Sequence, residues 1–144
     1  MKSAQIKFFK AYNGLLAVIL ALLGFSTSCE ETRVEYGTPS AKFIVNGTIE
    51  SKESSKPIKN LRVVMQYDTT YSDGDGNYQV AVTDFPDDQD FQLEVADVDG
   101  PENGDYQDLD TIVQFRNPEF INGDGDWYSG ETQQEINIKL NPKE

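Results

Sequence analysis

From Ala41 onward, apolar and polar side chains alternate with a period of two residues in a series of short segments. Such alternation is typical of β-strands that turn one face to a core and the other to water. Clusters of glycine, proline, asparagine, aspartate and serine separate the segments and predict turns. The alternating apolar positions include Phe43, Val45, Ile49, Leu61, Val63, Met65, Tyr67, Tyr78, Val80, Val82, Phe91, Leu93, Val95, Val113, Phe115, Ile136, Ile138 and Leu140.

Six or seven such segments in about 104 residues predict an all-β domain over residues 41–144. We expect a single antiparallel β-sandwich of about seven strands, in which two facing sheets each bury one alternating face. A large apolar side chain contributes roughly 1.5–3 kcal/mol when it is fully buried. A domain of this size can therefore fold without a disulfide or a metal ion.

The first 28 residues follow a different pattern. Lys2, Lys7 and Lys10 give a basic start, and an apolar run follows at residues 15–25. This run is shorter than the roughly 20 residues that a membrane-spanning helix needs. A basic start, a short apolar run and the small residues that follow it predict a secretory signal peptide with an N-terminal signal helix over residues 1–28.

The chain's one cysteine, Cys29, directly follows this segment. The sequence around it resembles the lipobox of bacterial lipoproteins, with Ser26 in place of the usual leucine. The resemblance implies that the thiol of Cys29 receives a diacylglyceryl group, that the signal is cut before it, and that the new amino terminus is acylated. Two or more fatty chains give the stable anchoring that one chain cannot give. The alternative is ordinary secretion with a free thiol.

Residues 29–40 are polar, end in glycine and proline, and predict a flexible tether. Glu30 and Glu31 resemble the surface-export signal of lipoproteins from Bacteroidota, while the alternative is a solvated linker. The expected location is the outer membrane, on its periplasmic or its cell-surface face.

The charge of the chain and its lack of histidine exclude several functions. The chain has 12 basic and 25 acidic residues, a net charge of −13, and no histidine. Without histidine, Ser-His-Asp catalysis, Cys-His catalysis and histidine-ligated metal sites are excluded. Cleavage before Cys29 would remove three lysines and leave nine basic against 25 acidic residues, a net charge of −16. Such a charge repels phosphate backbones, so no nucleic-acid partner is expected, and the lipid must hold the protein at the membrane.

Two stretches resemble the carboxypeptidase regulatory-like domains. The first runs from VNGTI at 45–49 through KPI at 56–58 to LRV at 61–63, and the second is YSDGDGNYQV at 71–80. The resemblance implies a transthyretin-like, Greek-key sandwich, in which the first stretch forms a strand pair and the second a hairpin with Tyr78 turned inward.

The chain as a whole resembles the lipoproteins of the radical-SAM-associated lipoprotein system of Bacteroidota. The resembling stretches are LGFS at 23–26, EYGTP at 35–39, DVDGPENG at 97–104 and GDGDWYSG at 123–130. The resemblance implies an envelope protein encoded with a radical-SAM protein, and it leaves the activity open. It also raises the alternative that this chain is a substrate which the associated radical-SAM enzyme modifies.

The acidic turns provide candidate metal ligands. Alternating acids at 73–77 and 122–126 begin like EF-hand loops, but Tyr78 and Trp127 stand where the sixth residue should be glycine. Calcium sites in sandwich loops can instead combine carboxylates and carbonyls from several turns. The alternative is that these are solvated turns, which favour aspartate and asparagine. The candidate calcium ligands are Asp97, Asp99, Glu102, Asn103 and Asp105.

Trp127 and Tyr128 lie in a loop rich in glycine and aspartate. Exposed aromatic side chains on such loops can stack on a sugar ring or anchor a partner. The alternative is that Trp127 folds back to close the core, because an indole buries a large apolar area.

Enzymatic activity is not expected, because no carboxylate pair or deep cleft is indicated. We expect a lipid-anchored envelope lipoprotein that acts as a non-catalytic binding or structural accessory module. Its expected partners are the membrane, through lipidated Cys29, and an envelope protein or a glycan. The alternatives are a calcium-stabilised recognition domain and a substrate of the radical-SAM enzyme. No cofactor other than calcium is expected.

Overall fold

The computed structural model describes residues 12–16, 18 and 37–144. The chain divides into two compact units, and the second unit is Gly37–Glu144. In the first unit, residues 12–16 and 18 are helical. The described residues contain no helix that is long and apolar enough to cross a membrane. Cys29, most of the predicted tether and most of the predicted signal peptide lie outside the described residues.

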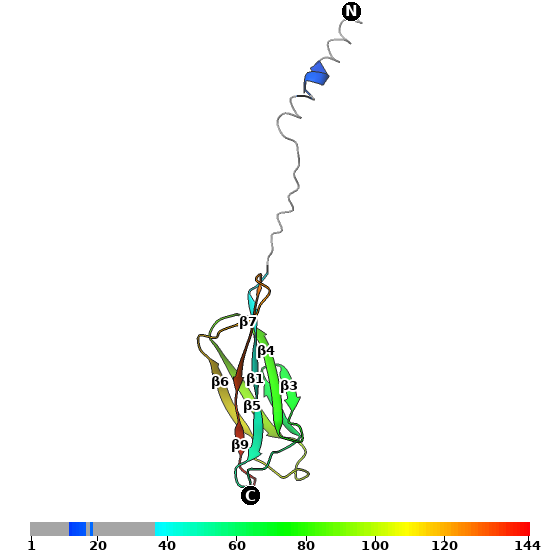
Figure 1. The fold of residues 1–144 in the computed structure, drawn as a ribbon. Helices are drawn as coiled ribbons and strands as arrows, with labels where there is room; N and C mark the ends of the chain where they lie inside the picture. The colour runs from blue at the N-terminus through cyan, green and yellow to red at the C-terminus, as the bar shows by residue number, and fades with distance from the viewer. Residues whose placement is uncertain (1–11, 17, 19–36) are drawn as a thin grey trace, which may run out of the picture. The chain divides into compact units, whose positions relative to one another are not determined.

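The second unit is a sandwich of two sheets (Figure 1). The first sheet has the order β4-β1-β8-β7, and β9 also pairs with β1; the second sheet has the order β3-β2-β5-β6. The strands of the first sheet are β1 (Ser40–Ser51), β4 (Asn77–Asp84), β7 (Ile121–Asn122), β8 (Tyr128–Glu135) and β9 (Ile138–Leu140). The strands of the second sheet are β2 (Leu61–Met65), β3 (Asp68–Tyr71), β5 (Gln89–Asp97) and β6 (Leu109–Phe115).

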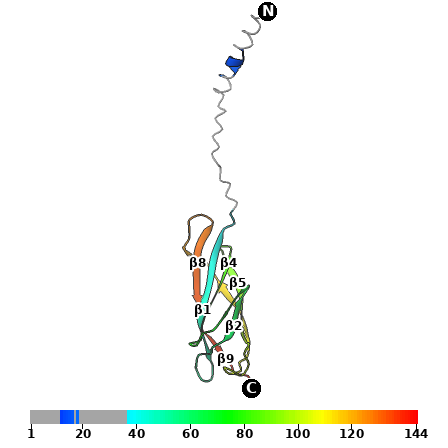
Figure 2. The ribbon, with the colours of Figure 1, turned by 90° about the vertical axis from the view of Figure 1, so that its right-hand side faces the viewer.

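The predicted β-sandwich is confirmed, but the first sheet is mixed instead of purely antiparallel. β1 is antiparallel to β4 and parallel to β8 and to β9, which follow one another along the same side of β1 (Figure 2). The segment 131–135, which has no apolar alternation, belongs to β8, and β3 is a further strand that the alternation did not predict. Both strands are specified by their neighbours in the sheets and not by an apolar face of their own.

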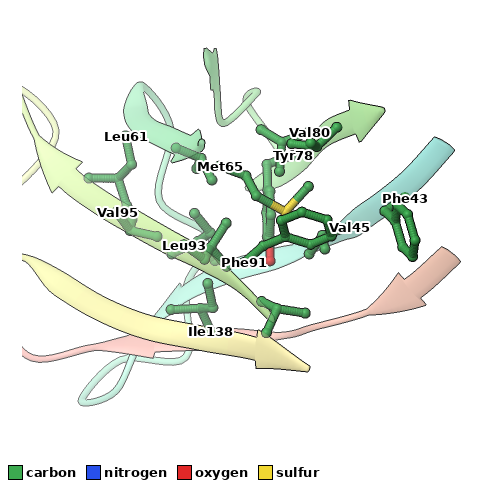
Figure 3. Packing of buried hydrophobic residues seen from close by; sticks show 14 of the residues in the cluster. Phe43, Val45, Leu61, Met65, Tyr78, Val80, Phe91, Leu93, Val95 and Ile138 are labelled. Carbon is green, nitrogen blue, oxygen red and sulfur yellow. The ribbon is translucent and has the colours of Figure 1, made fainter. Parts of the chain in front are cut away.

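The predicted core is confirmed. The apolar side chains of both sheets point toward one another and form one buried cluster (Figure 3). Phe43 of β1 makes edge-to-face contacts with Phe91, Phe115 and Phe120 at centroid distances of 5.2, 5.1 and 5.6 Å. Ile136 is only partly buried against this cluster.

Tyr67 does not continue the alternation of the segment before it. β2 ends at Met65, and Gln66 adopts a φ of 58°, so the chain turns and Tyr67 is 73% exposed. Its hydroxyl lies against the outer edge of β4, where it donates to the carbonyl of Thr83 at 2.9 Å and accepts from the Thr83 amide at 3.2 Å. The next residue, Asp68, accepts a hydrogen bond from the Ala81 amide at 2.8 Å. The β2–β3 turn therefore closes part of the free edge of β4.

Candidate functional site

The candidate site lies where the parallel ladder beside β1 is interrupted. β1 pairs with β8 as far as Asn46 and Glu135, and pairing resumes with β9 at Ile49 and Ile138. Between these points the backbone of Ile136 crosses Gly47 so closely that a Cβ on this glycine would lie 1.9 Å from the Ile136 carbonyl oxygen. Glycine inside a strand often marks such an approach of two backbones.

Hydrogen bonds of three side chains stabilise this crossing. The Tyr78 hydroxyl donates to the Ile136 carbonyl at 2.8 Å. The backbone amide and the hydroxyl of Thr48 both donate to Oδ1 of Asn137, each at 2.9 Å, in place of the missing ladder bonds. Burial raises the pKa of Tyr78 to about 12, so its hydroxyl stays a neutral donor at physiological pH.

The strand register lines up polar side chains across the outer face of the first sheet. Val45 and Ile49 point into the core, so Asn46 and Thr48 between them face outward. Asn46 lies opposite Gln79 of β4 on one side and Glu135 of β8 on the other. We call this the first row.

The second row lies beside the first, one step further along β1. In it, Thr48 lies opposite Asn77 of β4 and is hydrogen-bonded to Asn137. The two rows therefore carry amide, hydroxyl and carboxylate groups across β4, β1 and the end of β8.

The two rows form the floor of a hollow that we call the polar groove. Besides the rows, its lining includes Thr70 and Tyr71 of β3 and Asp73 of the turn before β4, and its volume is about 490 Å³. The groove is open to solvent, and its side chains come from both sheets, since β3 belongs to the second sheet and β1 and β4 to the first.

Some groove side chains are already engaged. Oδ1 of Asp73 accepts from the amides of Asp75 and Asn77, and its Oδ2 accepts from Nδ2 of Asn77. These bonds, with the Asn77 side chain as the largest cause, hold the pKa of Asp73 below its usual value. Nδ2 of Asn137 donates to Oε1 of Glu135 at 3.0 Å, which orients that carboxylate.

Other groove side chains face solvent with their polar groups free. In residues 37–144, the side-chain amides of Asn46 and Gln79 and the hydroxyl of Tyr71 make no hydrogen bond with the protein. The Tyr71 side chain is 52% exposed. The hydrogen-bonded side chains thus fix the shape of the groove, and the free side chains are available for contact with a ligand.

The predicted calcium ligands lie at the end of β5 and in the loop between β5 and β6, and several of them accept or donate hydrogen bonds within the chain. Oδ2 of Asp97 accepts from the Tyr106 amide at 2.8 Å. Oδ2 of Asp99 accepts from Nδ2 of Asn60 at 2.9 Å and from Nδ2 of Asn103 at 2.5 Å. These two hydrogen bonds hold the pKa of Asp99 below its usual value, and the bond from Asn60 has the larger effect.

The remaining predicted ligands do not extend this cluster. Asp105 forms an ion pair with Lys143 at 2.9 Å, and the side chain of Glu102 is exposed. Among the described residues, no group of three or more histidine, cysteine, aspartate or glutamate side chains is arranged to hold a metal ion. The calcium site stays a prediction.

Trp127 and Tyr128 lie at the opposite end of β1 from the groove. The Trp127 indole lies over Gly37, where a Cβ would come within 2.2 Å of the ring, and its carbonyl accepts from the Ser40 amide at 2.8 Å. The indole is 38% exposed and does not join the core cluster, so it covers the start of the folded unit instead of closing the core. Tyr128 is half-buried beside Ser40. A ligand contact at these aromatics stays a prediction.

Comparison of the sequence with models of known protein families found no match, and comparison with curated proteins found none either. The resemblance to the radical-SAM-associated lipoproteins therefore stays a prediction. The pattern of the sequence does not mark Asn46, Gln79, Glu135 or Asn137 as site residues. The signal that could have found them is Gly47, because glycine inside an alternating strand indicates a close backbone approach.

Proposed function

We propose that this protein is a non-catalytic binding module, held at the outer membrane through lipidated Cys29, which binds its ligand in the polar groove. The proposal rests on one observation: some polar side chains of the groove are held by hydrogen bonds within the protein, and others are free. Thr48, Asn77 and Asn137 are held by hydrogen bonds within the sandwich, while the amides of Asn46 and Gln79 remain free. Binding sites are built in this way, because pre-positioned groups lose little freedom when a ligand arrives.

The position of the groove agrees with display from a tether. The predicted tether joins the sandwich at the start of β1, and Asn46 lies six residues further along that strand. At about 3.3 Å per residue, the groove begins roughly 20 Å from this end of the sandwich. The groove therefore lies away from the point at which the predicted tether joins β1.

The ionisation state of Asp73 argues against general acid catalysis by this carboxyl group. General acid catalysis by a carboxyl group requires a raised pKa, so that the group holds a proton near neutral pH. The hydrogen bonds from Asn77 and Asp75 lower the pKa of Asp73 and keep it ionised. Asp73 therefore serves as a fixed acceptor that shapes the turn before β4.

The anchor is tested by labelling cells that express the full chain with a palmitate analogue. We expect wild type and a Thr32→Ala control to carry the label and to fractionate with the outer membrane. Cys29→Ala should lose the label and keep its amino-terminal segment, because the thiol that accepts the lipid is absent. A Cys29→Ala protein that is labelled and processed like wild type would contradict the anchor.

The binding site is tested by hydrogen–deuterium exchange on the mature full chain, with and without an extract of the cell envelope. We expect added protection at residues 46–48 and 77–79. An Asn46→Ala, Gln79→Ala double variant should lose that protection. Gln92→Ala is the control, because Gln92 lies on β5 in the second sheet and contacts Asp110. Unchanged exchange at the groove in wild type would reject the groove as the binding site.

A further inference from the structure

We infer that the polar groove binds a neutral saccharide. The inference rests on the proposed function and adds the chemical class of the ligand. It follows from four properties of the groove: the sign of its charge, the donors and acceptors that its free groups offer, the aromatic ring at its border, and the state of the strand edge beside it.

The charge of the groove excludes anionic ligands. Its charged side chains are Asp73 and Glu135, and no lysine or arginine lines it in the part of the chain that the structure describes. Phosphate, sulfate and carboxylate groups are bound by cationic side chains or by clustered backbone amides. A ligand with such groups would instead face two negative charges in a protein that is acidic overall.

The free groups of the groove match hydroxyl groups. A sugar hydroxyl both donates and accepts a hydrogen bond, and an amide side chain offers a carbonyl acceptor and an NH₂ donor side by side. Asn46 and Gln79 lie directly opposite one another on β1 and β4. Neighbouring strands are about 4.8 Å apart, so both amides can reach hydroxyl groups of one ring or of two linked rings. Glu135, held through Oε1 by Asn137, adds a carboxylate acceptor in the same row.

Tyr71 supplies the apolar part of the site. Its half-exposed ring comes from β3 and borders the groove beside β4. A sugar ring has faces of C–H groups as well as hydroxyl groups, and an aromatic ring at the side of a polar row can cover such a face. Tyrosine does this at low entropic cost, because it has only two side-chain torsions.

The strand edge beside the groove argues against an extended peptide. A peptide that adds to a sheet needs the free N–H and C=O groups of an edge strand. Along the edge of β4, Asp73 accepts from the Asn77 amide, Asp68 from the Ala81 amide, and Tyr67 bonds both backbone groups of Thr83. These contacts close the edge on both sides of Gln79. The groove instead crosses the strands, and contacts are made by side chains.

The test is isothermal titration calorimetry on the mature, lipidated full chain. The chain is kept in a polyoxyethylene detergent, because the sugar head group of a maltoside or glucoside would compete. The probes are neutral gluco-, galacto-, manno- and xylo-oligosaccharides of four to six units, at up to 10 mM. Oligogalacturonate is the anionic counterpart, and an uncharged hexapeptide is the peptide counterpart. We expect at least one neutral oligosaccharide to bind and both counterparts to fail.

The variants locate the binding. Asn46→Ala and Gln79→Ala should each weaken the affinity roughly three- to tenfold, the range for the loss of one hydrogen bond. Tyr71→Ala should weaken the affinity by a similar factor. Tyr71→Phe keeps the aromatic ring and should therefore retain most of the affinity that the ring provides. Gln92→Ala and Ile112→Ala are the controls, since both lie on the second sheet and outside the groove. Unchanged unfolding temperatures would show that the variants keep their fold.

Three outcomes would overturn the inference: no heat with any neutral oligosaccharide, stronger binding of the anionic or peptide probe, or binding that the groove variants leave unchanged. These outcomes are separable from a failure of the proposed function. Protection of residues 46–48 and 77–79 by the envelope extract, without saccharide binding, would reject the saccharide and keep the binding module. If the extract gives no protection and no saccharide binds, the binding module is rejected as well.

Discussion

At the scale of single residues, the polar groove depends on a contact between two backbones. The carbonyl of Ile136 lies over Gly47 and accepts a hydrogen bond from the Tyr78 hydroxyl, and Glu135 and Asn137 are its neighbours in the chain. A side chain at position 47 would displace this carbonyl and, with it, one end of both polar rows. Gly47 and Tyr78, which both line the groove, therefore also determine its shape.

Gly47→Ala tests this contact. The added Cβ would lie 1.9 Å from a backbone oxygen, which must move, so we expect the free energy of unfolding to fall by about 1–3 kcal/mol. Urea unfolding followed by tryptophan fluorescence measures the change. Gly74→Ala is the matched control, because a Cβ there meets nothing within 4 Å among the residues that the structure describes, and its effect should stay within about 0.5 kcal/mol. Equal stabilities of the two variants would refute the close approach.

Tyr78→Phe tests the hydroxyl at the same crossing. Loss of the bond to the Ile136 carbonyl should cost about 1 kcal/mol near neutral pH. The pKa of Tyr78 is about 12 in the folded protein and 10.0 in its ordinary state. The unfolded chain therefore loses this proton first as the pH rises, and the stability from the neutral phenol, complete below pH 10, declines between pH 10 and 12.

The measurement for Tyr78 is a series of urea unfolding curves from pH 8 to pH 12. The informative quantity is the difference between wild type and Tyr78→Phe, because the two proteins differ only in this hydroxyl. We expect wild type to lose more stability than the variant above pH 10. Parallel pH profiles would mean that Tyr78 is not buried in the way described.

At the scale of elements, part of the edge of β4 is closed by the turn between β2 and β3 and by the first residue of β3. Asp68 accepts from the Ala81 amide, and Tyr67 bonds the backbone of Thr83. An open strand edge invites pairing with another chain, and polar side chains that occupy the edge groups prevent it. This turn thus stabilises the fold and leaves the face of β4 free to contribute Gln79 and Asn77 to the groove.

Asp68→Ala tests the closure of this edge. The Ala81 amide would lose its partner, so we expect a loss of about 1–2 kcal/mol in the free energy of unfolding, together with faster aggregation on mild heating. Urea unfolding and light scattering are the measurements. Thr69→Ala is the control from the same strand, since Thr69 is exposed and its side chain makes no hydrogen bond in the described residues. Equal aggregation rates in both variants would contradict the protective role.

The elements also show where prediction from the sequence succeeded. β2, β4 and β5 alternate apolar and polar residues, and the core residues that this pattern predicts, such as Leu93 and Val80, are buried. β8 was not predicted over 131–135, because polar residues such as Gln134 stand where an apolar face would be expected. Gln134 instead donates from its side chain to the carbonyl of Gln114 on β6, a contact between distant segments. Local patterns cannot report such a contact.

At the scale of the whole molecule, local sequence patterns indicate the acidic loop but not the groove, because the groove depends on contacts between distant segments. The acidic loop at 97–105 attracts notice because its residues are neighbours in the sequence. The groove brings together residues 46–48, 70–73, 77–79 and 135–137, which only the sheet register and the crossing at Gly47 place side by side. Its polar residues look like ordinary outward-facing strand positions until their neighbours are known.

The acidic loop gives the last prediction, which concerns calcium. Oxygens of Asp97 and Asp99 already accept hydrogen bonds from Asn60, Asn103 and Tyr106, and a bound ion would have to replace some of them. We therefore expect the unfolding temperature of the full chain to be the same, within about 1 °C, in 2 mM calcium chloride and in 2 mM EDTA. Magnesium chloride at the same concentration controls for the screening of the acidic surface by salt.

If calcium does bind, the expected gain in stability can be calculated. Calcium at one hundred times its dissociation constant would add about 2.7 kcal/mol, which raises the unfolding temperature of a domain of this size by several degrees. If the rise appeared with calcium, was absent with magnesium and was lost in Asp99→Asn, the loop would be a calcium site. The protein would then be a calcium-stabilised recognition domain, and saccharide binding in the groove would have to be measured again with calcium present. An unchanged unfolding temperature leaves Asp97 and Asp99 as acceptors that fix the β5–β6 loop.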